Sequence, residues 1–342
     1  MNFKSGSELM KTKVLSTSDE DLDIAAEIIR SGGLVAFPTE TVYGLGADAL
    51  NPEAVRKIYQ VKGRPADNPS IVHISQIEEL KGLCLEITED IRTLAAVFWP
   101  GPMTMIVKRD PKIPDVTTGG LDTVGIRMPR GKGASELIRR SGLPIAAPSA
   151  NISGKPSPTE AQHVLDDFDG RIEAVIDDGP CDVGIESTVI DMTGASPMIL
   201  RPGFLTKRDF EEALGKPVLL DPTLNQRPDP SRDDFHPKAP GQKYKHYAPD
   251  AEMILFDGDP ENVRKAILAE QKRREEAGQK VRVLFFDEAH EREAARYFFA
   301  DLRKADRDGI EVILASALPE EGLGFSVMNR MLKSSGFHII HV

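Results

Sequence analysis

The sequence has no long apolar run and few cysteines. No stretch approaches the roughly 18 consecutive apolar residues of a membrane-spanning helix, and the first residues lack the apolar core of a signal peptide. We therefore expect a cytoplasmic protein that does not bind membranes. Cys84 and Cys181 are the only cysteines in 342 residues, too few for a disulfide framework or a four-thiolate zinc site. Both are interpreted as inert core residues.

Signatures of several common enzyme classes are missing as well. The sequence has no Gly-x-x-x-x-Gly-Lys-Ser/Thr motif, and YGLGAD (43–48) lacks the third glycine of the dinucleotide-binding motif. The seven histidines form no His-Glu-x-x-His pair, and no Gly-x-Ser-x-Gly occurs. These absences argue against P-loop kinases, Rossmann dehydrogenases, zinc enzymes and serine hydrolases. We predict no metal site formed by the protein itself.

Positive charge is scarce. Lysine and arginine number 43 against 54 acidic residues, which gives a net charge of −11. Because nucleic-acid binding needs cations that neutralise phosphates, this balance disfavours nucleic-acid binding over the whole surface. It still allows a local basic pocket.

The length and patterning predict two domains and a linker. At about 150 residues per domain, 342 residues correspond to two. Residues 13–208 interleave strands and helices without strict alternation, which predicts a twisted mixed α/β sheet. A proline-rich polar stretch follows, and we assign 209–249 as the linker. Residues 250–342 alternate strictly between strand and helix, which predicts a small parallel, Rossmann-like α/β domain.

Individual elements follow from apolar periodicity and capping residues. In the first domain we expect strands at 34–38, 71–74, 104–107, 123–127, 144–147, 174–176, 187–191 and 198–200, and helices near 51–63, 86–98, 134–141, 159–166 and 207–215. In the second we expect strands at 253–256, 281–286, 311–315 and 337–342, and helices at 260–277, 290–305 and 324–335.

Polar residues follow a predicted strand in PTETVYGLG (38–46). Thr39, Glu40, Thr41 and Tyr43 come directly after a buried strand, where side chains reach a crevice rather than the core. A simple turn in which Glu40 caps nearby amides would explain this segment about equally well.

Two further segments carry cations in defined positions. In VKGRPADNP (61–69), Lys62 and Arg64 end a helix and are followed by prolines that fix the loop. They could be ordinary partners of the helix dipole, but the rigid loop favours phosphate binding. In GIRMPR (125–130), Arg127 interrupts an apolar strand. An arginine flanked by apolar residues is suited to clamp a carboxylate in a cleft.

A loop rich in small polar residues follows the strand at 144–147. APSANISGKPSPT (147–159) presents hydroxyls, amides and free backbone N–H groups, which can hold a polyphosphate. Ser149, Asn151, Ser153 and Ser157 are the candidates. IESTVID (185–191) and LRPG (200–203) add Ser187, Thr188 and Arg201 near strand ends. The composition of each segment alone would indicate only a loop. The prediction of a phosphate-binding site depends on the recurrence of polar residues near several strand ends.

Seven motifs in order resemble the YrdC-like domain of threonylcarbamoyl-AMP synthases. They are FPTETVYGLG, KGRPADNPSIVHI, WPGPMT, GIRMP, APSANISGKPSPT, IESTVID and LRPG, and the resemblance covers residues 13–206. PGQKYKHYAP (240–249) and the second domain resemble the long, two-domain form, in which the linker folds over the active site as a lid. Ala239 and Gln242 replace the serine and methionine usual in that linker motif.

The resemblance implies an L-threonylcarbamoyladenylate synthase, a nucleotidyltransferase. Such enzymes condense L-threonine, bicarbonate or CO2, and ATP into threonylcarbamoyl-AMP and pyrophosphate. The product serves the threonylcarbamoyl-transfer machinery that modifies adenosine 37 of ANN-decoding tRNAs, so contact with tRNA is at most indirect. Mg2+ is expected with ATP, and no tightly bound organic cofactor is expected.

The resemblance also implies site residues. Lys62, Arg64, Ser149 and Asn151 would be the catalytic residues at the phosphates. Further ATP contacts would be Asn68, Thr123, Ser157, Arg201 and Tyr247, and threonine contacts would be Thr41, His73, Arg127, Ala147 and Ser187. No residue is assigned as a general base.

Two other functions remain open at this stage. Hydrogenase maturation proteins carry a similar domain and adenylate a carbamoyl group, but their zinc fingers need more than two cysteines. An RNA-binding, translation-associated module is disfavoured by the net charge of −11 and by the absence of aromatic RNA-stacking motifs. No role is assigned to the C-terminal domain.

Overall fold

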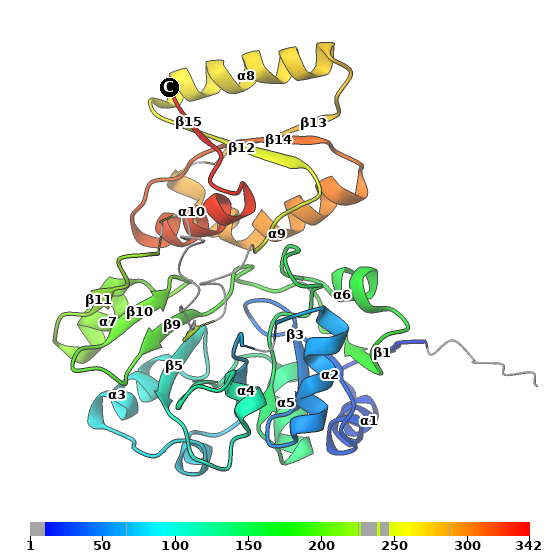
Figure 1. The fold of residues 1–342 in the computed structure, drawn as a ribbon, viewed down its shortest axis with the longest axis vertical. Helices are drawn as coiled ribbons and strands as arrows, with labels where there is room; N and C mark the ends of the chain where they lie inside the picture. Colours follow the sequence, from blue (N-terminus) through cyan, green and yellow to red (C-terminus); the bar gives the residue numbers. More distant parts are fainter. Residues whose placement is uncertain (1–10, 66, 225, 227–237, 240–245, 287) are drawn as a thin grey trace, which may run out of the picture.

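Two sheets, one large and mixed and one small and parallel, organise the chain (Figure 1). The structure is a computed structural model that describes residues 11–65, 67–224, 226, 238–239, 246–286 and 288–342. Most of the second half of the predicted linker, including Gln242 and the first six residues of PGQKYKHYAP, lies outside the described residues. No helix among the described residues is long and apolar enough to cross a membrane.

The large sheet is mixed, as predicted from the irregular alternation of strands and helices. It has 11 strands in the order β1-β8-β2-β3-β7-β4-β6-β5-β9-β10-β11. The strands are β1 (Lys13–Leu15), β2 (Val35–Phe37), β3 (Gly44–Asp48), β4 (Ile71–His73), β5 (Met103–Lys108), β6 (Thr123–Arg127), β7 (Ile145–Ala146), β8 (Ala174–Ile176), β9 (Thr188–Asp191), β10 (Met198–Arg201) and β11 (Leu219–Leu220).

Helices of the first domain lie between its strands in the sequence, and some of them begin at a residue whose side chain caps the helix. They are α1 (Asp19–Arg30), α2 (Pro52–Lys62), the 3-10 helix η1 (Ile77–Gly82), α3 (Glu89–Phe98), α4 (Asp115–Thr118), α5 (Lys132–Ser141), α6 (Ala161–Phe168) and α7 (Lys207–Leu214). In α2, the Asn51 side chain accepts hydrogen bonds from the amides of residues 53 and 54, and Gly63 ends the helix with φ 61°. This ending places Lys62 on the last turn and Arg64 on the loop that follows.

The small sheet is parallel, as predicted. Its order is β13-β14-β12-β15. The elements are β12 (Glu252–Asp257), α8 (Pro260–Glu276), β13 (Val281–Leu284), η2 (Glu288–His290), α9 (Glu291–Arg307), β14 (Val312–Ser316), α10 (Gly322–Ser334) and β15 (Ile339–His341). Helix α8 covers the outer face of this sheet, whereas α9 and α10 lie between it and the first domain (Figure 1). The second domain therefore presents two helices to the first.

The two domains share an apolar cluster. Val42, Val183 and Ile185 of the first domain belong to the same buried cluster as Phe299 and Met331, which lie on α9 and α10. Between Val183 and Ile185, Gly184 has φ 80°, and a Cβ atom there would lie 2.3 Å from the backbone oxygen of Arg296. The backbones of the two domains therefore meet directly at Gly184.

Part of the segment predicted as the linker belongs to the first domain's packing. β11 pairs with β10 in parallel, with Met198 opposite Leu219. Further on, Ala239 is fully buried against Ile106 and Leu200. The short strand was missed because two residues give no detectable periodicity.

Strand β3 was also missed, because glycine is depleted in strands and two glycines indicated a loop. The structure explains them by packing. At Gly46, which pairs with Val35 of β2, an added Cβ would lie 2.7 Å from the Phe37 ring and 2.8 Å from the Ile145 side chain. Glycine lets these two side chains meet over the strand.

We expect Gly46→Ala to lower the free energy of unfolding by about 1–3 kcal/mol, because the methyl group overpacks a closed core. Urea denaturation monitored by circular dichroism measures this. Gly194→Ala is the matched control, since the nearest atom to its Cβ is 3.6 Å away. Equal midpoints for the two variants would show that Gly46 is not required for packing.

Candidate active site

A pocket lies over the central strands of the large sheet and collects most of the predicted site residues. Its lining includes Arg64, His73, Arg127, Ala147, Ser149, Ser187, Arg201 and Tyr247. The predicted residues Lys62, Asn68, Thr123, Asn151, Ser157 and Thr41 do not line it. A larger cavity of about 840 Å³ lies at the strand ends of the second domain, and no predicted site residue lines it.

Strand register explains why distant residues meet here. β4 and β6 run parallel with His73 directly opposite Arg127. Ile71 and His73 both line the pocket, and because side chains alternate along a strand they share one face. The pocket therefore extends from the ends of β4 and β6, where His73 and Arg127 lie, over one face of the sheet as far as Ile71.

Arg127 is buried and only partly satisfied. Its Nη1 donates to the Thr41 hydroxyl at 2.9 Å, and its Nη2 lies 2.9 Å from a Glu40 carboxylate oxygen. Nε and Nη2 nevertheless have no aligned hydrogen-bond acceptor among the described residues. A buried guanidinium with two such N–H groups is suited to receive a carboxylate in a bidentate pair.

His73 is neutral beside Arg127. Burial, and secondly the charge of Arg127, lower its pKa to about 3. Its Nδ1 lies 3.2 Å from the carbonyl oxygen of Ile71. The imidazole therefore adds no charge of its own to the pocket at neutral pH.

This burial predicts a pH dependence of stability. Between pH 6.5 and about 3, the unfolded chain binds a proton at His73 that the folded chain does not bind. Stability is therefore lost as the pH falls through that window, by at most about 1.4 kcal/mol per pH unit. We expect His73→Gln to show a shallower loss between pH 6.5 and 5 in urea denaturation. The control is His338→Gln, at an exposed position; parallel curves for wild type and His73→Gln would contradict the prediction.

Lys62 holds a loop in this structure. Its ammonium group donates to the carbonyl oxygens of Ser149 and Asn151 at 2.6 and 2.5 Å. The side chain is buried, and burial lowers its pKa well below the usual value. We define residues Ser149–Ser157 as the Ser-Asn loop. Within it the Ser149 hydroxyl donates to Asn151, whose Nδ2 donates to the carbonyls of Ile152 and Lys155.

Arg64 and Arg201 bring cations to the pocket from two segments of the first domain that are far apart in the sequence. Arg64 lines it while its Nη2 donates to the carbonyl oxygens of Asn68 and Pro69 at 3.3 and 3.0 Å. Arg201 is buried and donates to the carbonyl and hydroxyl oxygens of Ser187 at 2.9 and 3.2 Å. With Arg127, these make a cationic hollow in a chain whose net charge is −11.

Sequence reasoning missed several residues of the site. Glu186 lines the pocket, accepts from the Ser157 hydroxyl at 2.6 Å and pairs with Arg330 at 3.0 Å. Burial raises the pKa of Glu186, but the charges of Arg330 and Arg201 hold it below its usual value. IESTVID contained Glu186, whereas nothing in the sequence pointed to Arg330, which lies on α10.

His246 and Tyr247 line the pocket from the segment that leads into the second domain. Burial lowers the pKa of His246 to about 3 and raises that of Tyr247 to about 12. Tyr247 has φ 64°, a conformation that costs a bulky residue about 1–3 kcal/mol. Its ring lies 5.1 Å from that of Phe299 on α9. The second domain thus holds Tyr247 in the pocket wall.

The remaining predicted residues do not line the pocket. Asn68 is buried, and its Oδ1 has no hydrogen-bond partner among the described residues. Thr123 begins β6 opposite Lys108. Cys84 and Cys181 are buried free thiols, as predicted. Among the described residues, no three His, Cys, Asp or Glu side chains form a group that could hold a metal ion.

Comparisons with known proteins give a consistent result. A family described as "Telomere recombination" matches residues 27–203, and one described as "Threonylcarbamoyl-AMP synthase, C-terminal domain" matches 205–336. The chain is 49% identical to a threonylcarbamoyl-AMP synthase of Pyrococcus abyssi, over 93% of this chain and 95% of that protein. It is 43% identical to that of Bacillus subtilis, over 96% and 97%.

A solved structure is similar over almost the whole chain. This is P. abyssi Sua5 complexed with L-threonine, with a TM-score of 0.91 and 46% identity, covering 97% of this chain and 100% of that one.

Proposed function

The chain belongs to the threonylcarbamoyl-AMP synthase family, and from this premise we propose how its residues hold the substrates. The enzyme is an adenylyl transferase that uses L-threonine and ATP. The comparisons name the reaction, and the arrangement of side chains in the pocket supports the division of roles proposed below.

We propose that Arg127 binds the carboxylate of threonine. The supporting observation is that its buried Nε and Nη2 lack aligned acceptors in the described structure. Thr41 and Glu40 fix the guanidinium from one side. His73, Ala147 and Ser187 line the same pocket as Arg127. A relative was solved with L-threonine bound, which agrees with an amino-acid site in this fold.

We propose that the triphosphate lies along Arg64, Ser149 and Arg201. These line the same pocket as Arg127, and cations that neutralise charge growing on phosphates stabilise such transfers. Lys62 keeps the Ser-Asn loop in place through Ser149 and Asn151. We propose that from this position its ammonium group also contacts the phosphates. Asn68, Thr123, Asn151, Ser157 and Tyr247 complete the proposed ATP site.

The proposed chemistry has two steps. The threonine amine adds to CO2 with loss of a proton, or to bicarbonate with loss of water, and forms a carbamate. A carbamate oxygen then attacks the α-phosphorus of ATP, the bond to the bridging oxygen breaks, and pyrophosphate leaves. Carbamates revert in water, so the pocket must hold amine, carbon and phosphorus together. Such alignment contributes up to about 7–11 kcal/mol in favourable cases.

Mg2+ enters this proposal with ATP, as part of the substrate. Both oxygens of Glu186 are occupied, by Ser157 and Arg330, and the described residues form no group of three metal ligands. We therefore expect the phosphates and water to hold the ion, and we assign no resident cofactor to the protein.

The broader context is also a proposal. We place the enzyme in the cytoplasm, where its product would pass to the machinery that transfers threonylcarbamoyl to tRNA. We retain 13–208, 209–249 and 250–342 as catalytic domain, linker and C-terminal domain. Tyr247, buried in the pocket wall, supports the proposal that the linker closes the site.

A labelling experiment tests the proposed function. Purified enzyme is incubated with MgATP, L-threonine and 14C-bicarbonate, and nucleotides are separated by chromatography. We expect label in an AMP-linked product, and pyrophosphate in equal amount, only when all three substrates are present. Pyrophosphate release without threonine, or an unlabelled adenylate, would refute the assignment.

A further inference from the structure

We propose that the C-terminal domain takes part in catalysis by holding the Ser-Asn loop in place through Arg303, a positioning residue on α9. This inference rests on the proposed function, because it concerns the loop assigned to ATP. The comparisons give the C-terminal domain a family, but no residue of it a role.

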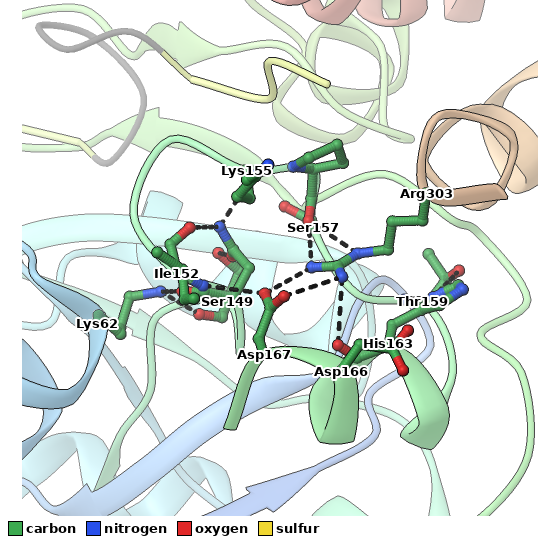
Figure 2. A network of polar contacts seen from close by, with 12 residues as sticks. Lys62, Ser149, Ile152, Lys155, Ser157, Thr159, His163, Asp166, Asp167 and Arg303 are labelled. Carbon is green, nitrogen blue, oxygen red and sulfur yellow. Dashed lines mark hydrogen bonds and ion pairs between the residues drawn. The ribbon is translucent and has the colours of Figure 1, made fainter. Parts of the chain in front are cut away.

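Arg303 belongs to the C-terminal domain, but the acceptors of its side-chain hydrogen bonds lie in the first domain (Figure 2). Its side chain is 7% exposed. Nε and Nη2 donate to the carbonyl of Pro156 at 3.1 and 2.7 Å, and Nη1 donates to the carbonyl of His163 at 3.2 Å. Both Nη groups also contact the Asp167 carboxylate, at 3.3 and 2.8 Å. The guanidinium thus has one fixed orientation.

Asp167 connects Arg303 to the Ser-Asn loop. Its Oδ2, which receives Arg303, also accepts from the backbone amide of Ile152 at 3.0 Å. Ile152 directly follows Asn151, and Pro156 directly precedes Ser157. Arg303 therefore fixes the loop near both ends, directly at Pro156 and through Asp167 at Ile152. Lys62 fixes the opposite side through Ser149 and Asn151 (Figure 2).

A second arginine of the same domain acts on the end of the loop. Arg330, on α10, is fully buried and donates to one oxygen of Glu186, whose other oxygen accepts from the Ser157 hydroxyl. Two helices of the C-terminal domain therefore converge on residues 152–157 by independent routes.

The two domains are also joined by contacts that do not involve Arg303. The apolar cluster that joins them already includes Val183, Ile185, Phe299 and Met331. A buried ion pair adds little net stability compared with apolar side chains of similar volume. It does impose a unique geometry, and displacement of a reacting group by about 1 Å can cost about 100-fold in rate. The contacts of Arg303 are therefore better explained by positioning.

The test uses full-length variants and separate saturation curves for ATP and threonine. For Arg303→Met we expect kcat/KM for ATP to fall about 10- to 100-fold, while KM for threonine stays within about twofold. Arg303→Lys, which keeps the charge, should recover part of the loss. Arg307→Met is the matched control, one turn along α9, where the more exposed Arg307 lies 3.8 Å from Asp166; it should behave as wild type.

Two further readouts separate positioning from stability. Hydrogen exchange at the Ile152 amide should accelerate at least about 10-fold in Arg303→Met at a temperature where the chain is folded. The double variant Arg303→Met with Asp167→Leu should lose clearly less activity than the sum of the two single losses, expressed as free energies, because the two residues act along one path. Unchanged kcat/KM for ATP, or a KM for threonine that rises as much as the KM for ATP, would overturn the proposal. Wild type without synthase activity in the same assay would instead refute the proposed function.

Discussion

Replacing Arg127 by lysine is expected to lower kcat/KM for threonine about 100-fold, with KM for ATP nearly unchanged. The lysine keeps a positive charge beside Glu40, so no buried carboxylate loses its partner. It cannot offer two N–H groups in the plane of a carboxylate, and a lost hydrogen bond to a charged group costs about 1.5–3 kcal/mol. A factor of 100 corresponds to about 2.8 kcal/mol.

The matched control for Arg127 is Arg130→Lys. Arg130 lies three residues further along the chain, is exposed and does not line the pocket. Steady-state kinetics with threonine varied at saturating ATP measure both variants. If Arg127→Lys raised KM for ATP as much as KM for threonine, the arginine would not be specific for the amino-acid carboxylate.

Replacing Arg64 by alanine is expected to lower kcat about 100- to 1000-fold, the usual loss when one preorganised stabiliser of developing charge is removed. Arg64 follows α2, is only partly buried and donates hydrogen bonds to two backbone carbonyls. Removing it empties no core, so the change in unfolding free energy should stay near 1 kcal/mol.

Arg56→Ala provides the comparison for Arg64. Arg56 lies on α2 itself, is half exposed and pairs, within the described part of the chain, only with Glu53. Arg56→Ala should therefore leave both activity and stability unchanged within error. Pyrophosphate release and urea denaturation are measured on the same preparations. A loss of activity for Arg64→Ala that merely paralleled a loss of stability would contradict a role at the phosphates.

Local chemistry determined how far the sequence could predict the fold. Strong periodicity and caps located α2 and the alternating elements after residue 250, and they agree with the structure within a few residues. β3 was missed because Gly46 serves a contact between Phe37 and Ile145, which are distant in sequence. Short strands such as β11 have too few residues for alternation to be visible.

The site was predictable where a motif carried its own chemistry. Arg127 and Arg64 were identified from an unusual neighbourhood, and both line the pocket. Lys62 came from the same motif, yet its ammonium contacts the Ser-Asn loop, because its direction depends on carbonyl groups more than 80 residues away. Arg303 and Arg330 could not be found, since an arginine on an amphipathic helix is ordinary until its partner in another domain is known.

Gly184 limits which substitutions the interface between the two domains can accept. The two halves touch there main chain to main chain, and even a methyl group would collide with Arg296. A side chain at this position would push the two domains apart while leaving the chemical identity of every polar side chain unchanged. Substitutions of increasing size, from alanine to valine, would therefore change the spacing of the two domains in steps. Their activities would show how much displacement adenylate formation tolerates.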